Sequence, residues 1–174
     1  GNHSGNYRLP AGDDPAAFGA QDLVIVGLKA HAIAAMLPRM RALIADIDAA
    51  RGTALARELG AAGHFVRCDH TDRRQCRAAV EATLARFGAL DILHNNAGGP
   101  FAGPVESADD ATLERVIGVN LIGVFKMTQE ALPALREAGR RRPAGAVILF
   151  TSSLQGIKAR PNYTVYTASK HGIV

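Results

Sequence analysis

Five short apolar runs, separated by stretches of helical periodicity, restrict the fold of this sequence more than any other feature. The runs lie at residues 23–26, 42–45, 65–68, 92–93 and 146–150 and are rich in Val, Ile and Leu. Such runs suit strands that are buried on both faces of a parallel sheet. Because strands that alternate with helices form βαβ units, the sequence predicts an α/β fold with a doubly wound parallel sheet.

The composition suits one folded domain. Of the 174 residues, 48% are apolar and 21% are charged, which is enough apolar side chain to exclude intrinsic disorder as the main state. Residues 1–21 are polar and rich in Gly, Pro and Asp, and we expect them to form a flexible N-terminal leader ahead of a domain at 22–174. The arginine run at 140–142 has no interleaved aromatic residues, so it is interpreted as a solvated loop rather than a nucleic-acid contact.

Cysteine content and hydropathy narrow the class of protein further. Cys68 and Cys76 make no disulfide framework, and no His or Cys cluster completes a metal site. No apolar run approaches the ~18 residues that a membrane span needs. The sequence therefore predicts a cytoplasmic protein with reduced thiols and without a metal, membrane or nucleic-acid partner.

Capping residues set the expected ends of two helices. Thr71 is expected to cap a helix that runs to residue 87 and ends at Gly88. Ser107, with Asp110 three residues later, resembles a capping box that starts the next helix. That helix carries an apolar stripe composed of Leu113, Val116, Ile117, Leu121 and Val124. Asn120 lies within the stripe, so its amide is either a satisfied structural group or part of a chemical site.

The end of the chain carries the residues best suited to proton transfer. Thr151, Ser152 and Ser153 follow the last apolar run, where parallel sheets bind ligands. Tyr166 and Lys170 are four residues apart, so a helix would place them on one face. A lysine ammonium close to a phenol favours the phenolate, which can exchange a proton with a substrate oxygen. Alone, however, this spacing also fits an ordinary amphipathic helix with a solvent-exposed lysine.

Other motifs accompany the Tyr-Lys pair in a fixed order. Asn-Asn-Ala-Gly stands at 95–98, directly after the fourth run. Asp46 and Asp69 follow the second and third runs, and Ser153 lies 13 residues before Tyr166. From about residue 23 to residue 174 this set resembles the short-chain dehydrogenase/reductase family, whose domain is a Rossmann-like dinucleotide-binding sheet.

The resemblance implies roles for four catalytic residues. Tyr166 would be the general acid/base, and Lys170 would support it and bind the nicotinamide ribose. Ser153 would orient the substrate oxygen, with Ser152 as the alternative that the spacing disfavours. Asn120 would support a proton relay to the lysine, which replaces the purely structural interpretation of its amide.

The resemblance also implies a cofactor site. Asp69 and His70 would contact the adenine end, Asn95 would line the adenosine ribose, and Asn96 would be structural. The implied cofactor-binding residues are Gly27, Asp46, Asp69, His70, Asn95, Ala97, Gly98, Tyr166 and Lys170. A carboxylate at Asp46 would accept hydrogen bonds from ribose hydroxyls and repel a 2′-phosphate, so NAD is favoured over NADP. Arg51 is interpreted as a helix-surface residue.

The sequence departs from the family at two places. Only Gly27 remains of the glycine-rich loop. The segment from Gly27 to Asp46 spans 19 positions, and Pro38 interrupts the expected first helix. The chain also stops four residues after Lys170. We expect the domain to be incomplete at its C-terminal end and to lack glycine-loop residues, as if only the ordered part of a longer chain were given.

The function that the sequence predicts is an NAD-dependent oxidoreductase that interconverts a secondary alcohol and a ketone. The alternative is a non-catalytic dinucleotide-binding or scaffold protein on the same fold. By analogy with the family, a homo-oligomer, either a dimer or a tetramer, is expected. The substrate itself is not readable; the residues expected near its pocket are Gly99, Pro100, Leu154, Gln155 and Tyr163.

Overall fold

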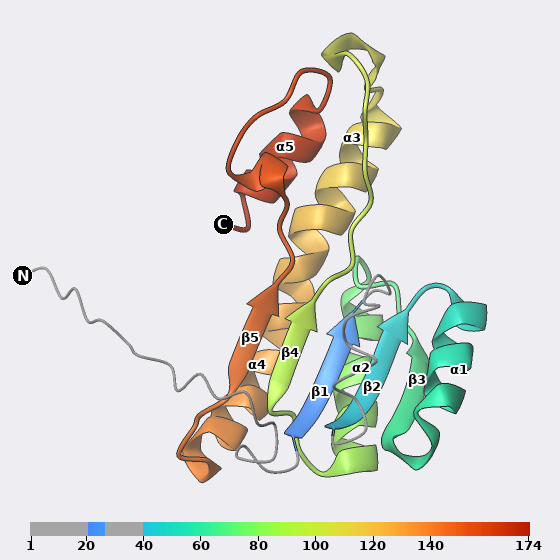
Figure 1. The fold of residues 1–174 in the computed structure, drawn as a ribbon, viewed down its shortest axis with the longest axis vertical. Helices are drawn as coiled ribbons and strands as arrows, with labels where there is room; N and C mark the ends of the chain where they lie inside the picture. Colours follow the sequence, from blue (N-terminus) through green and yellow to red (C-terminus); the bar gives the residue numbers. More distant parts are fainter. Residues whose placement is uncertain (1–20, 27–39) are drawn as a thin grey trace, which may run out of the picture.

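The structure is a computed structural model that describes residues 21–26 and 40–174. Within these ranges one sheet of five parallel strands has the order β3-β2-β1-β4-β5 (Figure 1). The strands are β1 Gln21–Val26, β2 Met40–Asp46, β3 Gly63–Arg67, β4 Ile92–Asn95 and β5 Val147–Phe150. The strand order changes direction between β1 and β4, which confirms the predicted doubly wound sheet. Ligands bind such sheets at the carboxyl ends of the strands beside this point.

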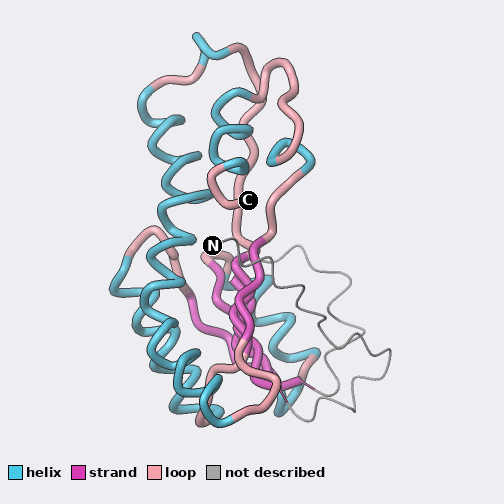
Figure 2. The backbone as a smooth tube through the Cα atoms, turned by 90° about the vertical axis from the view of Figure 1, so that its left-hand side faces the viewer, coloured by secondary structure: helices cyan, strands magenta, loops and turns pink. Residues whose placement is uncertain are grey.

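Helices cover the sheet on both faces, as Figure 2 shows. The helix α2 (Arg73–Phe87) packs beside α4 (Gly123–Arg141) on one face, and α1 (Ala49–Glu58) packs against β3 on the other. The helices α3 (Asp110–Ile117) and α5 (Thr164–His171) extend beyond the carboxyl ends of β4 and β5 (Figure 1). Short helical turns connect these elements: Gly60–Ala62, Val105–Ser107, the π-helical turn η5 at Gly118–Ile122, and η6 at Leu154–Gly156.

The core lies between the sheet and the pair α2 and α4. The four residues of β2 from Ala42 to Ala45 are fully buried, as the apolar run predicted. They are joined in the core by Leu90, Leu93, Met127, Ala131 and Leu135. The strand β5 differs, because Leu149 and Phe150 remain 47% and 45% exposed. Burial on both faces was therefore wrong for β5, which has one neighbouring strand in the described sheet.

Two expected helix caps were wrong by one or two residues. Asp72, rather than Thr71, caps α2 and accepts a hydrogen bond from the backbone of Arg74. Asp109 caps α3, because its carboxylate accepts from the Thr112 N–H, whereas the Ser107 hydroxyl donates to the Pro104 carbonyl. In both cases a carboxylate lies close enough to accept the helix N–H.

The C-terminal end of α2 follows the prediction. Gly88 ends the helix in the left-handed conformation, with φ of 82°.

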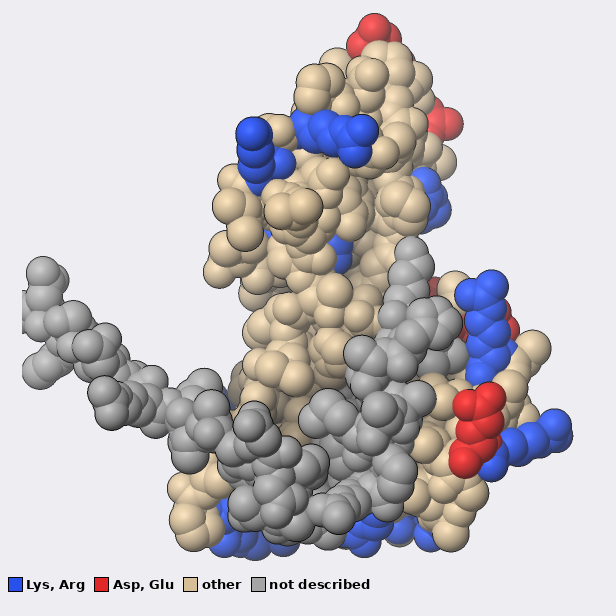
Figure 3. Space-filling model, viewed as in Figure 1, with Lys and Arg blue, Asp and Glu red and all other residues tan. Residues whose placement is uncertain are grey.

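The arginine run at 140–142 is not a solvated loop. Arg140 and Arg141 form the last turn of α4, where both pair with Glu137. Arg142 forms an ion pair of 2.8 Å with Asp91, which is 1% exposed. The run therefore ends a helix and compensates a buried carboxylate. On the face shown in Figure 3, the described Lys and Arg side chains are dispersed rather than gathered in one patch.

Three sequence predictions fall outside the described residues. They concern residues 1–20 of the expected leader, the glycine at position 27, and the helix that contains Pro38. Among the residues that are described, no helix has both the length and the apolar character required to cross a membrane.

Candidate active site

Asn120 connects three segments of the chain. The π-helical turn η5 widens the helix between α3 and α4, and Asn120 on this turn is fully buried. Its Oδ1 accepts from the Gly99 N–H at 2.8 Å, and its Nδ2 donates to the Gly99 carbonyl and to Ser169 Oγ, both at 3.0 Å. The amide is thus satisfied, and it fixes the loop after β4 and the helix α5 against the same turn.

Lys170 lies at the centre of this arrangement. The side chain is only 3% exposed, and its Nζ donates to the Thr151 carbonyl at 2.8 Å. The same Nζ is 5.9 Å from the centroid of the Tyr166 ring, so the two side chains share a face of α5 as the spacing predicted. Burial lowers the pKa of Lys170, because the ammonium is removed from water.

Gly98 allows these groups to come together. A Cβ at this position would lie 3.3 Å from both Asn120 Oδ1 and Lys170 Nζ. The absence of a side chain therefore lets the loop after β4 approach the amide and the ammonium more closely than an alanine could.

The two serines after β5 have different partners. The Ser152 hydroxyl donates to the backbone carbonyl of Lys170 at 2.9 Å and so anchors α5. The Ser153 hydroxyl caps the short turn η6, donating to Gln155 Oε1 and accepting from the Gln155 N–H. Ser153 is thus bonded within its own turn, where a substrate oxygen could compete for its hydroxyl. Tyr166 is half-buried and contacts Tyr163 edge to face, with ring centroids 6.3 Å apart.

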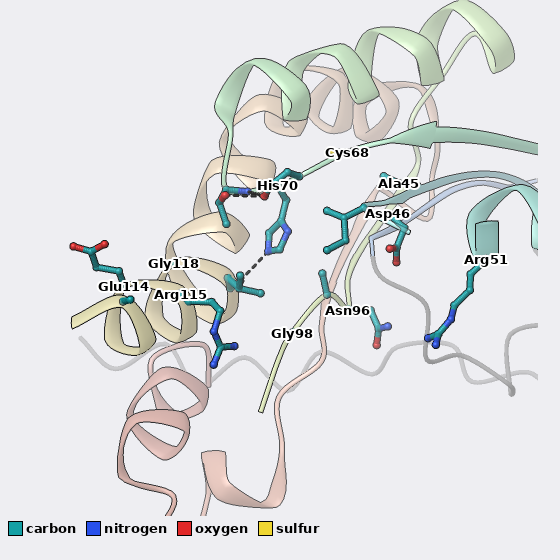
Figure 4. Close-up of a pocket in the computed structure, with 16 residues that line it drawn as sticks. Ala45, Asp46, Arg51, Cys68, His70, Asn96, Gly98, Glu114, Arg115 and Gly118 are labelled. Carbon is teal, nitrogen blue, oxygen red and sulfur yellow. Dashed lines mark hydrogen bonds between the residues drawn. The ribbon is translucent and has the colours of Figure 1, made fainter. Parts of the chain in front are cut away.

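A cavity of about 690 Å³ opens at the carboxyl ends of β2, β3 and β4 (Figure 4). This volume is typical of sites for small molecules and cofactors. The expected cofactor-binding residues that line it are Asp46, Asp69, His70, Ala97 and Gly98. The structure therefore gathers residues from three strand ends into one cavity.

The carboxylates on this wall are held by local hydrogen bonds. Asp69 Oδ1 accepts from the Thr71 hydroxyl at 2.7 Å and from the Thr71 N–H at 2.9 Å. These bonds lower the pKa of Asp69, so the group is ionised at neutral pH. Asp46 Oδ1 accepts from the Asp48 N–H at 2.7 Å.

His70 joins the end of β3 to the π-helical turn. It is 5% exposed, and its Nε2 donates to the Val119 carbonyl at 2.8 Å. Its ring packs so closely on Gly123 that a Cβ there would lie 2.4 Å from the ring. Burial lowers the pKa of His70 and favours the neutral imidazole.

The structure reverses the places expected for the two asparagines at 95 and 96. Asn95 is 3% exposed and donates to Thr128 Oγ1 at 3.1 Å, so it ties β4 to α4 and is not among the lining residues of the cavity. Asn96 lines the cavity and accepts from the Thr151 hydroxyl at 2.9 Å. Asn95 is the last residue of β4, so its side chain still obeys the alternation of side chains along the strand and points toward α4. Asn96 lies beyond the end of the strand, where this alternation no longer applies.

Two arginines at the cavity were not identified from the sequence. Arg51 lies on the exposed surface of α1, as expected, and it also lines the cavity beside Asp46 while its guanidinium pairs with Asp48 at 3.2 Å. Arg115 on α3 lines the opposite side (Figure 4). No signal in the sequence identified Arg115, because Val119, the lining residue one helical turn after it, is placed at the cavity only by the structure.

The residues present fit a nicotinamide dinucleotide. Carboxylates stand at the ends of β2 and β3, where they would accept hydrogen bonds from donors at the adenosine end of the dinucleotide. Gly98 lines the cavity and brings this wall close to the Lys170 ammonium, which would hold the ribose at the other end of such a molecule.

Comparison with known proteins agrees with this geometry. The sequence profile of the family described as short chain dehydrogenase matches residues 26–174. The chain is 38% identical over 137 residues to (+)-borneol dehydrogenase 1 of Salvia officinalis, covering 77% of this chain and 50% of that protein. It is 38% identical over 133 residues to trans-4-hydroxycyclohexanecarboxylate dehydrogenase of Sinomonas cyclohexanicum, covering 76% and 48%. The chain thus spans about half the length of these relatives.

Solved structures share the fold. A 3-ketoacyl-(acyl-carrier-protein) reductase from Brucella melitensis, complexed with NADH, superposes with a TM-score of 0.82 at 30% identity, covering 88% of this chain and 65% of that one. A short chain dehydrogenase/reductase from Burkholderia phymatum, in complex with NAD, gives a TM-score of 0.80 at 28% identity, covering 90% and 57%.

Proposed function

The chain belongs to the short-chain dehydrogenase family, and from this premise we propose that it is an oxidoreductase that interconverts a secondary alcohol and its carbonyl with a nicotinamide dinucleotide. The observation that carries the proposal is the buried Lys170 ammonium, which lies 5.9 Å from the Tyr166 ring and beside Gly98 and Asn120. The ammonium and the phenol thus share one face of α5, where the tyrosine can exchange a proton and the ammonium can bind the nicotinamide ribose.

Each polar side chain of the site has a role in this chemistry. The nicotinamide ring, when bound, supplies the carbon that exchanges a hydride with the substrate. In alcohol oxidation Tyr166 Oη accepts the hydroxyl proton, and in carbonyl reduction it returns the proton. Ser153 holds the substrate oxygen, Lys170 binds the nicotinamide ribose, and Asn120 keeps the loop at Gly99 and the helix α5 in register around them.

The proposed cofactor is NAD. The Asp46 carboxylate lines the cavity and would accept hydrogen bonds from the 2′ and 3′ hydroxyls of the adenosine ribose. It would also repel a 2′-phosphate. Arg51 lies close to it but is drawn toward Asp48, which weakens its attraction for a phosphate. We place Asp69, His70, Ala97 and Gly98 with Asp46 in the cofactor site, and the cavity geometry favours Asn96 over Asn95 for the ribose.

The cofactor preference is tested by the affinities of NADH and NADPH. The Asp46→Ser variant should lose its preference for NADH and gain affinity for NADPH, whereas Asp72→Asn, at the cap of α2, should change neither. An unchanged ratio of the two affinities in the Asp46 variant would show that another group selects the cofactor.

Catalysis is tested by following NADH absorbance with a panel of secondary alcohols. The relatives suggest borneol, trans-4-hydroxycyclohexanecarboxylate and 3-hydroxysteroids as panel members. The Tyr166→Phe variant should lose about 100- to 10,000-fold in kcat, the size of one general acid/base, while staying folded. Tyr163→Phe is the matched comparison and should lose far less. Binding of NADH without turnover of any alcohol or ketone would favour the non-catalytic alternative.

We further propose that the protein is a cytoplasmic homo-oligomer, either a dimer or a tetramer. Phe125 on α4 is 54% exposed, and an exposed aromatic side chain of this kind suits a contact between copies of the chain. Both cysteines are free, which suits a reducing compartment. Sedimentation of wild type and of Phe125→Glu would test the assembly, since the charge should shift the protein toward the monomer.

A further inference from the structure

A chain of hydrogen bonds runs from His94 on β4 to the cavity through the hydroxyl of Thr151. His94 Nε2 lies 2.8 Å from Thr151 Oγ1, and Thr151 Oγ1 donates to Asn96 Oδ1 at 2.9 Å. Because a threonine hydroxyl carries one proton, its donation to Asn96 requires His94 to be the donor in the other bond. The ring therefore carries a proton on Nε2, and the lowered pKa that burial gives His94 favours this neutral form at pH 7.

The orientation of the Asn96 amide agrees with this direction of donation. Asn96 lines the cavity, and its Oδ1 is the end that accepts from Thr151. The NH₂ group is consequently the end of the amide turned away from Thr151. If the Thr151 hydroxyl had no donor behind it, it could rotate to accept from the Asn96 NH₂, and the amide would turn over.

Thr151 also contacts the catalytic lysine. Its carbonyl accepts from Lys170 Nζ at 2.8 Å, and its N–H donates to the Asn95 carbonyl at 2.9 Å. The backbone of this residue is thus held between β4 and α5, while its side chain is held by His94. One residue at the end of β5 therefore links the wall of the cavity to the ammonium beside Tyr166.

We infer that His94 is a positioning residue for the cofactor: through the Thr151 hydroxyl it holds the Asn96 amide so that its NH₂ group donates to an oxygen of the bound dinucleotide. This inference rests on the proposed function. His94 itself touches neither the cofactor nor the reacting atoms, because it is not among the lining residues of the cavity.

The first test is a double-mutant cycle read by NADH affinity. His94→Val, whose branched side chain suits a strand, should weaken NADH binding about three- to tenfold, the range expected for one lost hydrogen bond. His94→Gln supplies an amide N–H in place of Nε2 and should restore most of the affinity. Thr151→Val should weaken binding by a similar factor, and adding His94→Val to it should weaken binding no further.

The matched control is His64→Val on β3. His64 is also a half-buried strand histidine, but it is not among the lining residues of the cavity. The inference predicts wild-type NADH affinity for this control. Wild-type affinity in His94→Val, full additivity of the two valine substitutions, or failure of His94→Gln to restore binding would overturn the inference.

The second test needs no cofactor. In ¹⁵N NMR spectra of the cofactor-free protein, the side-chain amide signals of Asn96 should shift in His94→Val and in Thr151→Val but stay in place in His94→Gln and His64→Val. Unmoved signals in both valine variants would refute the link. If wild type binds no NADH at all, the proposed function fails, and these spectra still decide whether His94 orients Asn96.

Discussion

Replacing Asn120 with alanine should destabilise the protein by about 2–4 kcal/mol. The variant removes three hydrogen bonds, two to the backbone of Gly99 and one to the hydroxyl of Ser169. Each such bond is worth about 1 kcal/mol net, with a spread of about 0.5 kcal/mol, so the three bonds together account for about 2–4 kcal/mol. Because Asn120 is fully buried, water reaches these partners poorly, which sets the estimate well above the cost of losing a surface hydrogen bond.

Urea unfolding followed by circular dichroism measures this loss as a shift of the midpoint at constant slope. Ile122→Ala is the matched control, since it changes a 44% exposed residue of the same π-helical turn and should cost less than about 1 kcal/mol. Equal losses in the two variants would contradict this prediction, because the cost would then arise from the turn itself and not from the Asn120 amide.

Three further predictions follow from contacts of the site and the core. Gly98→Ala should lower kcat/KM at least about tenfold, because its methyl group would press on the Lys170 ammonium 3.3 Å away and displace it. Arg142→Ala should cost about 2–3 kcal/mol in urea unfolding, because the Asp91 carboxylate is left in the interior without this ion pair. His70→Gln should reduce the loss of stability between about pH 7.5 and 5.5. Burial lowers the pKa of His70 in the folded state, so the unfolded chain binds the proton first and stability falls as the pH falls through about 6.5.

Each of these predictions has a result that would contradict it. Wild-type kcat/KM in the Gly98→Ala variant would contradict the first prediction, because it would mean that a methyl group at this position does not displace the Lys170 ammonium. Arg140→Ala removes an exposed ion pair and should cost less than about 1 kcal/mol, so an equal loss in the Arg142 variant would refute the role of the buried pair. An unchanged pH dependence in His70→Gln would assign the acid sensitivity to other groups, such as His94.

The strands and the Tyr-Lys pair were predictable because both follow from local periodicity. Fully buried runs such as residues 42–45 have few alternatives to a central strand. A separation of four residues places Tyr166 and Lys170 on one face of any helix, whatever packs around it. The structure confirms this placement.

Choices between neighbouring polar residues were not predictable in the same way. Asn95 and Asn96 are both candidates for the cavity wall, and the outcome depends on Thr128 of α4 lying within reach of the first. The cap of α2 is Asp72 and not the expected Thr71, because the Thr71 hydroxyl donates to the Asp69 carboxylate.

Buried ion pairs depend on segments far apart in the chain. The partner of Arg142 is Asp91, directly before the strand β4, and the sequence around the arginine run gives no sign of it. The three consecutive arginines by themselves favour a solvated segment, which is the interpretation that the sequence alone supports. Only the tertiary structure places a buried carboxylate beside it.

A crystal structure of the protein with NAD bound would show whether Lys170 and Tyr166 flank the nicotinamide end of the cofactor. The account predicts the nicotinamide ribose within hydrogen-bond distance of Lys170 Nζ, with Tyr166 Oη facing the space beside the nicotinamide ring and the adenosine ribose against Asp46. A dinucleotide bound elsewhere, or one whose nicotinamide end lies away from Lys170 and Tyr166, would contradict it.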